Sequence, residues 1–268
     1  MPDRPTVLDL FCGAAGGWSL GMHRAGFATV AACEIDPWRR LQFSHRNPEV
    51  LMYGDIRQLS ADRLYSDGCP DIDVIVGSPP CQDASSANAK GKGVDGERTG
   101  LFFEALRLVR EVRPRWVCLE NVPGLKSRGY DRVHDELEAA GYEVRPLVVG
   151  AWHAGAPHRR NRVWIIANAK SVRELQPQRG ISDERRRAGD ICEQWVSADD
   201  AHTPLLQRPS LFGASLQAWQ NWNGGPPDLG RVDDGLPKGM ARQALSAFGD
   251  AVCPQITEAI GRVIRPFL

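Results

Sequence analysis

The 268-residue sequence has no run of about 18 consecutive apolar residues, so we expect no membrane-spanning helix. Its first residues, MPDRPTVLDLF, lack the apolar segment and cleavage site of a secretory signal. The cysteines number seven, an odd count, and no pair has the short spacing of a zinc site or a redox motif. We therefore expect reduced thiols, no metal and a cytoplasmic location.

The chain also lacks net charge, because Lys plus Arg and Asp plus Glu both number 33. Total charge therefore indicates neither a nucleic-acid partner nor a membrane surface. A local excess exists between Arg159 and Asp190, where nine basic residues stand against four acidic ones. Such a run is often only a solvated surface, but beside a nucleic-acid cleft it would contact phosphates. No Gly-Lys-Ser run of the phosphate-binding type indicates a nucleotide triphosphate.

Short apolar runs alternate with helical patterns from Thr6 to Asn168, which predicts an α/β fold with a doubly wound, mostly parallel sheet. Leu101–Val112 and Val133–Ala140 repeat apolar residues at helical spacing and should cover that sheet. Crossover helices would join its strands. The seven expected strands are Thr6–Leu10, Thr29–Glu34, Val50–Tyr53, Val74–Gly77, Trp116–Glu120, Val144–Val149 and Val163–Ala167.

The segment after Asn168 has little periodicity and is rich in Arg, Gln, Pro, Gly and Trp as far as about Leu236. It is too long for an ordinary connection, so it is either an irregular recognition lobe or a partly disordered insert. Its tryptophans favour the lobe. Helical spacing returns at Gly239–Phe248 and Gln255–Ile264, which should pack back onto the first domain. We therefore divide the chain at residues 1–168, 169–236 and 237–268.

Three successive expected strands end in groups suited to a nucleoside. The first runs into a glycine-bearing turn from Cys12 to Gly17, which would let a ligand approach the backbone at a helix N-terminus. The second ends at Glu34, where ribose hydroxyls could donate, and the third precedes Asp55, which could face a base. Such acids can also simply cap helices. Three in a row favour a nucleoside-bearing cofactor.

The fourth and fifth expected strands end in a thiol and a carboxyl. Pro79 and Pro80 fix the backbone direction just before Cys81, and the fifth strand ends at Glu120. A lone cysteine is usually a small buried hydrophobe. Methylation of cytosine at carbon 5, however, needs this pair: a thiolate that adds to carbon 6 and an acid that polarises the ring at nitrogen 3. Arg160 and Arg162, two apart before a strand, could hold the ring's carbonyl oxygen or could only be a solvated strand entry.

In this order, these residues resemble the motifs of the cytosine-5 DNA methyltransferase family over roughly the first 168 and the last 30 residues. The resemblance implies a class I S-adenosylmethionine-dependent, Rossmann-like fold. It implies methyl transfer from S-adenosylmethionine to a flipped cytosine in double-stranded DNA, through a covalent Cys81 intermediate. The catalytic residues implied are Cys81, Glu120, Arg160 and Arg162. The cofactor residues implied are Phe11, Gly13, Gly16, Glu34, Ile35, Asp55, Ile56, Pro79, Asp250 and Ala251. The DNA-binding residues implied are Arg160 and, in the loop Ser85–Leu101, Ser85, Lys90, Lys92 and Arg98.

Three features depart from the family pattern: an extra residue in the glycine turn, His158 in place of Gln and Asp250 in place of Asn. The recognition region is short, which suggests a short target site and a phage or small restriction-modification system. We also expect a monomer. Ser78-Pro79-Pro80 also resembles the start of the exocyclic-amine methyltransferase motif, but that chemistry needs an aromatic residue where this chain has Cys81. An RNA-acting branch and a non-catalytic DNA-binding relative remain alternatives.

Overall fold

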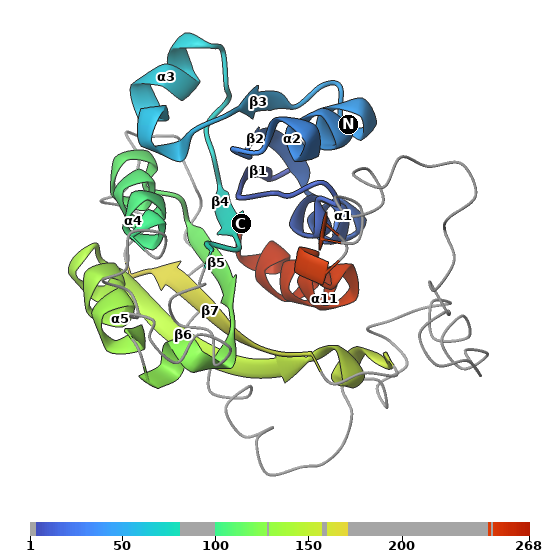
Figure 1. Cartoon of the computed structure of the whole chain (residues 1–268). Coiled ribbons are helices and arrows are strands. Elements are labelled where there is room, and N and C mark those ends of the chain that lie inside the picture. The colour runs from blue at the N-terminus through green and yellow to red at the C-terminus, as the bar shows by residue number, and fades with distance from the viewer. Residues whose placement is uncertain (1–3, 81–99, 128, 157–159, 171–245, 248) are drawn as a thin grey trace, which may run out of the picture.

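The structure is a computed structural model that describes residues 4–80, 100–127, 129–156, 160–170, 246–247 and 249–268. Across the described residues a seven-stranded sheet has the order β3-β2-β1-β4-β5-β7-β6 (Figure 1). All seven expected strands are present, with ends shifted by at most two residues. They are β1 (Thr6–Leu10), β2 (Ala28–Cys33), β3 (Leu51–Tyr53), β4 (Val74–Gly77), β5 (Trp116–Asn121), β6 (Tyr142–Gly150) and β7 (Asn161–Ala169).

The sheet is mostly parallel, as predicted, but β7 runs antiparallel to both of its neighbours. The expectation of crossover helices between all strands is therefore wrong at the β6–β7 connection. Only a short 3-10 turn, Ala151–Ala154, and a few further residues join these two strands. A parallel crossover needs a dozen or more residues, so the chain reverses here instead.

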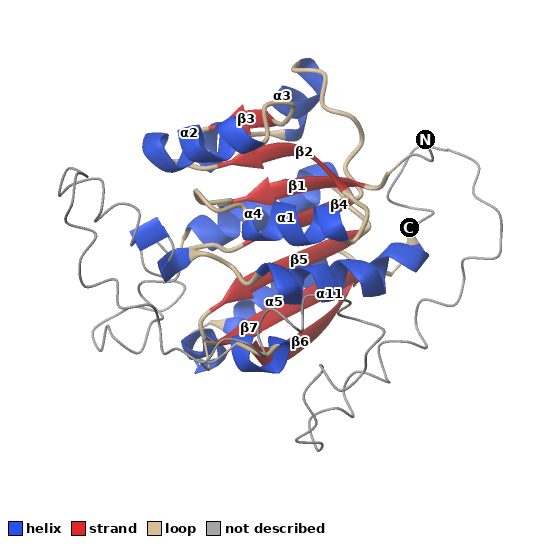
Figure 2. Cartoon of the chain, turned by 90° about the vertical axis from the view of Figure 1, so that its right-hand side faces the viewer, coloured by secondary structure: helices blue, strands red, loops and turns tan. Residues whose placement is uncertain are grey.

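Helices cover both faces of the sheet, and the alternation of side chains along β1 (Thr6–Leu10) shows why. Leu8 and Leu10 belong to the core on one face and Val7 to the core on the other. The first face carries α3 (Ala61–Ser66), α4 (Leu101–Val112) and α5 (Tyr130–Ala139), and the second carries α1 (Gly17–Arg24) and α11 (Pro254–Ile264) (Figures 1 and 2). The remaining helix of the described residues, α2 (Pro37–Arg46), buries Phe43 beside β2.

The C-terminal helix α11 lies directly against α1, as the return of helical spacing at Gln255–Ile264 predicted (Figure 1). Its Thr257 is completely buried, and the hydroxyl donates to the carbonyl oxygen of Gly17 at 2.9 Å. This hydrogen bond joins α11 to the first turn of α1, although the two residues lie 240 positions apart in the sequence. Most of Gly239–Phe248 and of the predicted lobe lies outside the described residues.

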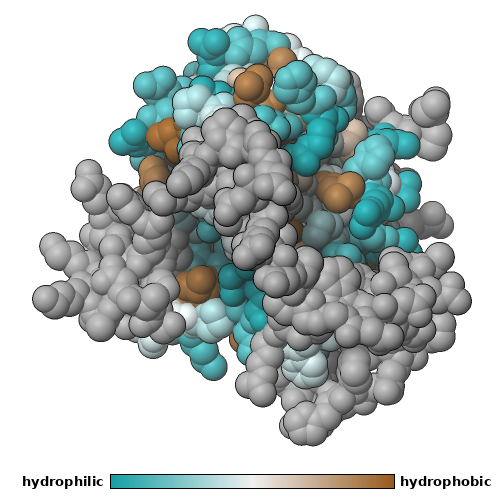
Figure 3. Space-filling model, turned by 45° about the vertical axis from the view of Figure 1, so that its right-hand side comes forward, coloured by the Kyte–Doolittle hydropathy of each residue, from teal (hydrophilic) through white to brown (hydrophobic). Residues whose placement is uncertain are grey.

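No helix within the described ranges has the length and apolar character needed to cross a membrane. On the face drawn in Figure 3, hydrophobic residues of the described part lie in small groups among hydrophilic ones.

A buried acid, Asp9, ties β1 to α1. Its Oδ2 accepts hydrogen bonds from the backbone N–H and the hydroxyl of Ser19, at 3.1 and 2.6 Å. Its Oδ1 is buried and has no hydrogen-bond partner in the part of the chain that the structure describes. Burial raises the pKa of Asp9 to about 7, against the opposing effect of the Ser19 hydrogen bonds.

We predict that Asp9→Asn flattens the dependence of stability on pH. The folded pKa of about 7 exceeds the ordinary aspartate pKa of about 3.9, so Asp9 favours folding while protonated, and this contribution is lost as pH rises between these two values. The free energy of unfolding of the native protein, minus that of the variant, should fall by up to about 1.4 kcal/mol per pH unit. Denaturant titrations at several pH values measure this difference. A difference that does not change with pH would contradict the assignment.

Candidate active site

The register of the five parallel strands aligns their carboxyl ends. Leu10 pairs with Cys33 on one side and with Gly77 on the other, while Cys33 pairs with Tyr53 and Gly77 with Leu119. The next residue on each strand therefore emerges at one edge of the sheet. These residues are Phe11, Glu34, Gly54, Ser78 and Glu120, and all of them line one cavity of about 530 Å³.

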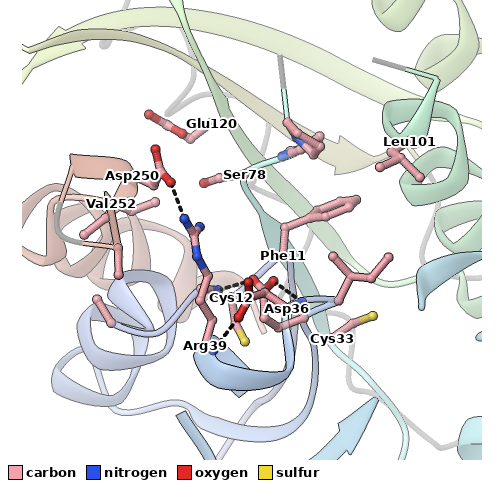
Figure 4. Close-up of a pocket in the computed structure, with 18 of the residues that line it drawn as sticks. Phe11, Cys12, Cys33, Asp36, Arg39, Ser78, Leu101, Glu120, Asp250 and Val252 are labelled. Carbon is pink, nitrogen blue, oxygen red and sulfur yellow. Dashed lines mark hydrogen bonds and ion pairs between the residues drawn. The ribbon is translucent and has the colours of Figure 1, made fainter. Parts of the chain in front are cut away.

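This cavity gathers most of the residues predicted to hold a cofactor (Figure 4). Nine of the ten line it: Phe11, Gly13, Glu34, Ile35, Asp55, Ile56, Pro79, Asp250 and Ala251. Its walls combine apolar side chains with carboxylates. Ile35 is 56% exposed although it is apolar, so its side chain is available to a ligand. Among the described residues no group of His, Cys, Asp and Glu side chains is arranged to hold a metal ion.

Two carboxylates shape the cavity from its strand ends. The Oε2 of Glu34 accepts from the backbone N–H of Gly13 at 3.0 Å, and Oε1 accepts from that of Asp36 at 2.9 Å. Glu34 thus joins the glycine turn to the end of β2. Asp55 accepts from the Nε and Nη2 atoms of Arg57, and these hydrogen bonds lower its pKa. Both acids therefore already have protein partners while they face the cavity. Asp55 caps the 3-10 turn Ile56–Gln58 by accepting from the backbone N–H of Arg57, as the capping alternative expected, whereas Glu34 caps no helix.

The tenth predicted cofactor residue, Gly16, does not line the cavity. It precedes α1 in the left-handed region at φ 59°, and a Cβ there would lie 2.7 Å from a ring carbon of Phe43. Gly13 shares the left-handed backbone, at φ 62°, but a Cβ there would meet nothing within 4 Å. Gly16 is therefore required by packing, whereas Gly13 leaves open space beside the cavity.

Glu120 is the buried carboxyl of the site, with 7% of its surface exposed. Its Oε1 lies 2.8 Å from the Nε of Arg162. Burial raises the pKa of Glu120, although the charge of Arg162 and a hydrogen bond from Ser78 oppose the shift. The carboxyl therefore holds a proton more readily than an exposed glutamate does, beside a fixed positive charge.

Side chains hold the backbone that leads from β4 toward Cys81. The amide nitrogen of Asn121 donates to the carbonyl oxygen of Pro79 at 3.2 Å, and the indole nitrogen of Trp18 donates to the Ser78 hydroxyl at 3.1 Å. Trp18 is buried edge-on against Trp164. We did not predict a role for Trp18, although a buried indole needs a hydrogen-bond acceptor.

Five of the predicted site residues lie outside the described residues: Cys81, Ser85, Lys90, Lys92 and Arg98.

The two predicted arginines both line the cavity but have different partners. Arg162 pairs with Glu120, whereas Arg160 donates from Nη1 and Nη2 to the carbonyl oxygens of Gly249 and Ala251, each at 2.7 Å. Arg160 precedes β7 with a positive φ of 36°, so the alternation of strand side chains does not govern it. These two hydrogen bonds attach Arg160 to the segment that precedes α11, about 90 residues later in the sequence.

Arg39 is a site residue that sequence reasoning missed. From α2 its Nη2 donates to the Asp250 carboxylate at 2.6 Å (Figure 4). The same nitrogen donates to the Ser246 hydroxyl at 3.0 Å. The unusual acid at position 250 was noticed in the sequence, but its partner was not. A carboxylate in place of the family's Asn was the available signal that a cation lies nearby.

Between β1 and β4 the strand order changes direction, and the cavity lies at the carboxyl ends of these strands. These features define a class I, Rossmann-like methyltransferase fold. A family model described as C-5 cytosine-specific DNA methylase matches residues 5–202, and the chain belongs to this family. This confirms the resemblance found in the sequence motifs.

Individual relatives agree with this placement. The chain is 35% identical over 172 residues to the Type II methyltransferase M.FnuDI of Fusobacterium nucleatum, over 62% of this chain and 47% of that protein. It is 33% identical to M.AquIA of Picosynechococcus, over 74% of this chain and 88% of that protein. A crystal structure of a candidate DNA modification methyltransferase from an Escherichia coli prophage aligns with a TM-score of 0.54 and 32% identity, over 68% of this chain and 50% of that one. The chain thus spans about half the length of several relatives that it matches.

The two glycines of the turn provide a matched test of the site. An alanine at Gly13 or Gly16 incurs the same left-handed strain, about 1–2 kcal/mol. Only Gly16→Ala also collides with Phe43, which should lower the free energy of unfolding by about 1–3 kcal/mol more. Denaturant unfolding of both variants measures the difference. Equal destabilisation would show that Gly16 is not packed as described.

Proposed function

We propose that this protein is a DNA (cytosine-5-)-methyltransferase. The observation that carries the proposal is Glu120, a buried carboxyl with a raised pKa that Arg162 contacts at 2.8 Å in the cavity. The same cavity holds Glu34 and Asp55, and the chain's family supports the assignment. One cavity thus combines an acid for polarising a base with carboxylates for a nucleoside.

S-adenosylmethionine is the cofactor whose chemistry these residues fit. Glu34 would accept from the ribose hydroxyls, Asp55 would face the adenine amine, and the exposed Ile35 would cover the adenine ring. The open space at Gly13 would let the ligand approach the backbone. When bound, the cofactor supplies a methyl group activated by a sulfonium. The chain's own residues would hold it at the carboxyl edge of the sheet.

The target cytosine must leave the duplex, because carbon 6 is not accessible within the base stack. The Cys81 thiolate then forms a bond to carbon 6 while Glu120 donates its proton to ring nitrogen 3. The electron pair of the carbon 5–carbon 6 bond becomes nucleophilic at carbon 5, which would form a bond to the methyl group. The bond between that methyl group and sulfur would break, and its electron pair would stay on sulfur in the thioether product S-adenosylhomocysteine. Loss of the carbon 5 proton to a base expels the Cys81 thiolate and restores the double bond, and nitrogen 3 returns its proton to Glu120.

The raised pKa of Glu120 serves this step because it favours the protonated form that donates to nitrogen 3. Arg162 would hold the carbonyl oxygen of the ring and stabilise negative charge there as the thiolate adds. Arg160 already donates to the backbone carbonyl oxygens of Gly249 and Ala251. We therefore assign the contact with the cytosine ring to Arg162 alone.

The DNA-binding parts of this proposal rest on the sequence. Ser85, Lys90, Lys92 and Arg98 would contact double-stranded DNA from the loop after Cys81, and residues 169–236 would form the recognition lobe. We propose that the enzyme acts as a monomer in the cytoplasm of a bacterium or of a phage-infected host.

Replacement of Cys81 tests the covalent chemistry. Cys81→Ser should lower methyl transfer by roughly a thousandfold or more, because a hydroxyl is a far weaker nucleophile than a thiolate. It should still bind S-adenosylmethionine in calorimetry. DNA containing 5-fluorocytosine at the target should trap the native enzyme as a covalent complex, because fluorine cannot leave as a cation.

Cys253→Ser is the control, since this thiol donates to the Gln255 side chain at 3.3 Å and does not line the cavity. This variant should form the trapped complex normally. Peptide mapping that finds the adduct on a cysteine other than Cys81, or full activity in Cys81→Ser, would overturn the mechanism.

A further inference from the structure

Two arginines from distant parts of the sequence bind the segment that precedes α11. This returning segment comprises residues 246–247 and 249–252 of the described chain. Arg160 binds its main chain, at the carbonyl oxygens of Gly249 and Ala251. Arg39 binds its side chains, at Ser246 and Asp250. The cavity wall in this region therefore depends on contacts to α2 and to the residue before β7.

The two attachments differ in kind. The contacts of Arg160 are to backbone carbonyls, so they do not depend on which side chains the segment carries. The contact between Arg39 and Asp250 is an ion pair of 2.6 Å, and it needs a carboxylate at position 250. Both partners line the cavity, so the pair forms part of the cavity wall (Figure 4).

Exposure makes this ion pair weak enough to open. The Asp250 side chain is 62% exposed and that of Arg39 is 24% exposed. An ion pair in contact with water contributes little to stability and is screened by salt. A cofactor must enter before each turnover and its product must leave afterwards, so a wall closed by a weak contact is suited to repeated opening.

We propose that Arg39 and Asp250 form an ionic latch that holds the returning segment against the cavity and slows dissociation of the bound nucleoside cofactor. This proposal rests on the proposed function for the identity of that cofactor. Arg39 and Asp250 are positioning residues in this account, because they act through the wall and not on the reacting atoms.

Asp250→Asn isolates the charge, because an amide keeps the size and an acceptor oxygen but loses the attraction to Arg39. In the full-length protein, the dissociation rate of S-adenosylhomocysteine, followed by stopped-flow competition, should rise about two- to fivefold. Arg39→Gln should have the same effect, and Arg39→Lys, which keeps the cation, should stay near the native rate. The double variant Arg39→Gln/Asp250→Asn should be no faster than either single variant, since the two residues act as one contact.

Asp67→Asn is the matched control. It makes the same chemical change in the Arg63–Asp67 ion pair of 2.7 Å, which does not line the cavity. It should leave the dissociation rate unchanged. Raising salt from about 0.05 to about 0.5 M should speed dissociation from the native protein more than from Asp250→Asn.

Hydrogen exchange supplies a readout without any ligand. Backbone amides of residues 246–247 and 249–252 should exchange faster in Asp250→Asn than in the native protein. Unchanged dissociation and unchanged exchange in both single variants would overturn the latch. If the double variant raised the dissociation rate by the product of the two single effects, the latch would also be overturned. Arg39 and Asp250 would then contact the ligand separately. Failure of the native protein to bind S-adenosylmethionine or S-adenosylhomocysteine would instead overturn the proposed function on which the latch rests.

Discussion

The site depends on one constraint, the alignment of five parallel strands at their carboxyl ends. Because Leu10 pairs with both Cys33 and Gly77, the chain leaves β1 between two neighbours whose connections run in opposite directions. A crevice at this switch point follows from the topology. The glycine turn, Glu34 and Glu120 line one cavity because of this register. A slip of one residue in any of these strands would turn its terminal side chain away from the cavity.

Burial and hydrogen bonding then give two carboxyls of the cavity different chemical properties. Glu120 has few solvent contacts, and its pKa rises even though Arg162 lies 2.8 Å away. Asp55 is held by hydrogen bonds from Arg57, and its pKa falls. One carboxyl is therefore suited to holding a proton and the other to accepting hydrogen bonds as an anion. This division matches an acid directed at a base and an acceptor directed at a cofactor.

Much of this arrangement could be predicted from the sequence, because parallel strands buried on both faces give clear apolar runs. The strand ends at Glu34, Asp55 and Glu120 followed from those runs. The reversal at β7 did not, because the expected strands stopped at Val149 and resumed at Val163, which left 13 residues between them, enough for a crossover. The strands β6 and β7 are longer at these ends and leave only 10 residues. The partners of Arg160 and Arg39 could not be predicted either, because they join segments more than 80 residues apart. Contacts of that kind depend on the packed fold and leave no local pattern.

The central claim is that this cavity directs a methyl group to carbon 5 of cytosine. The most direct test is to incubate the full-length protein with DNA and methyl-labelled S-adenosylmethionine, digest the DNA to nucleosides, and identify the labelled nucleoside by mass spectrometry and chromatography. We expect label in 5-methyl-2′-deoxycytidine with the native protein and almost none with Glu120→Gln. Label in a cytosine or adenine methylated on its exocyclic amine, or no labelled nucleoside from the native protein, would contradict it.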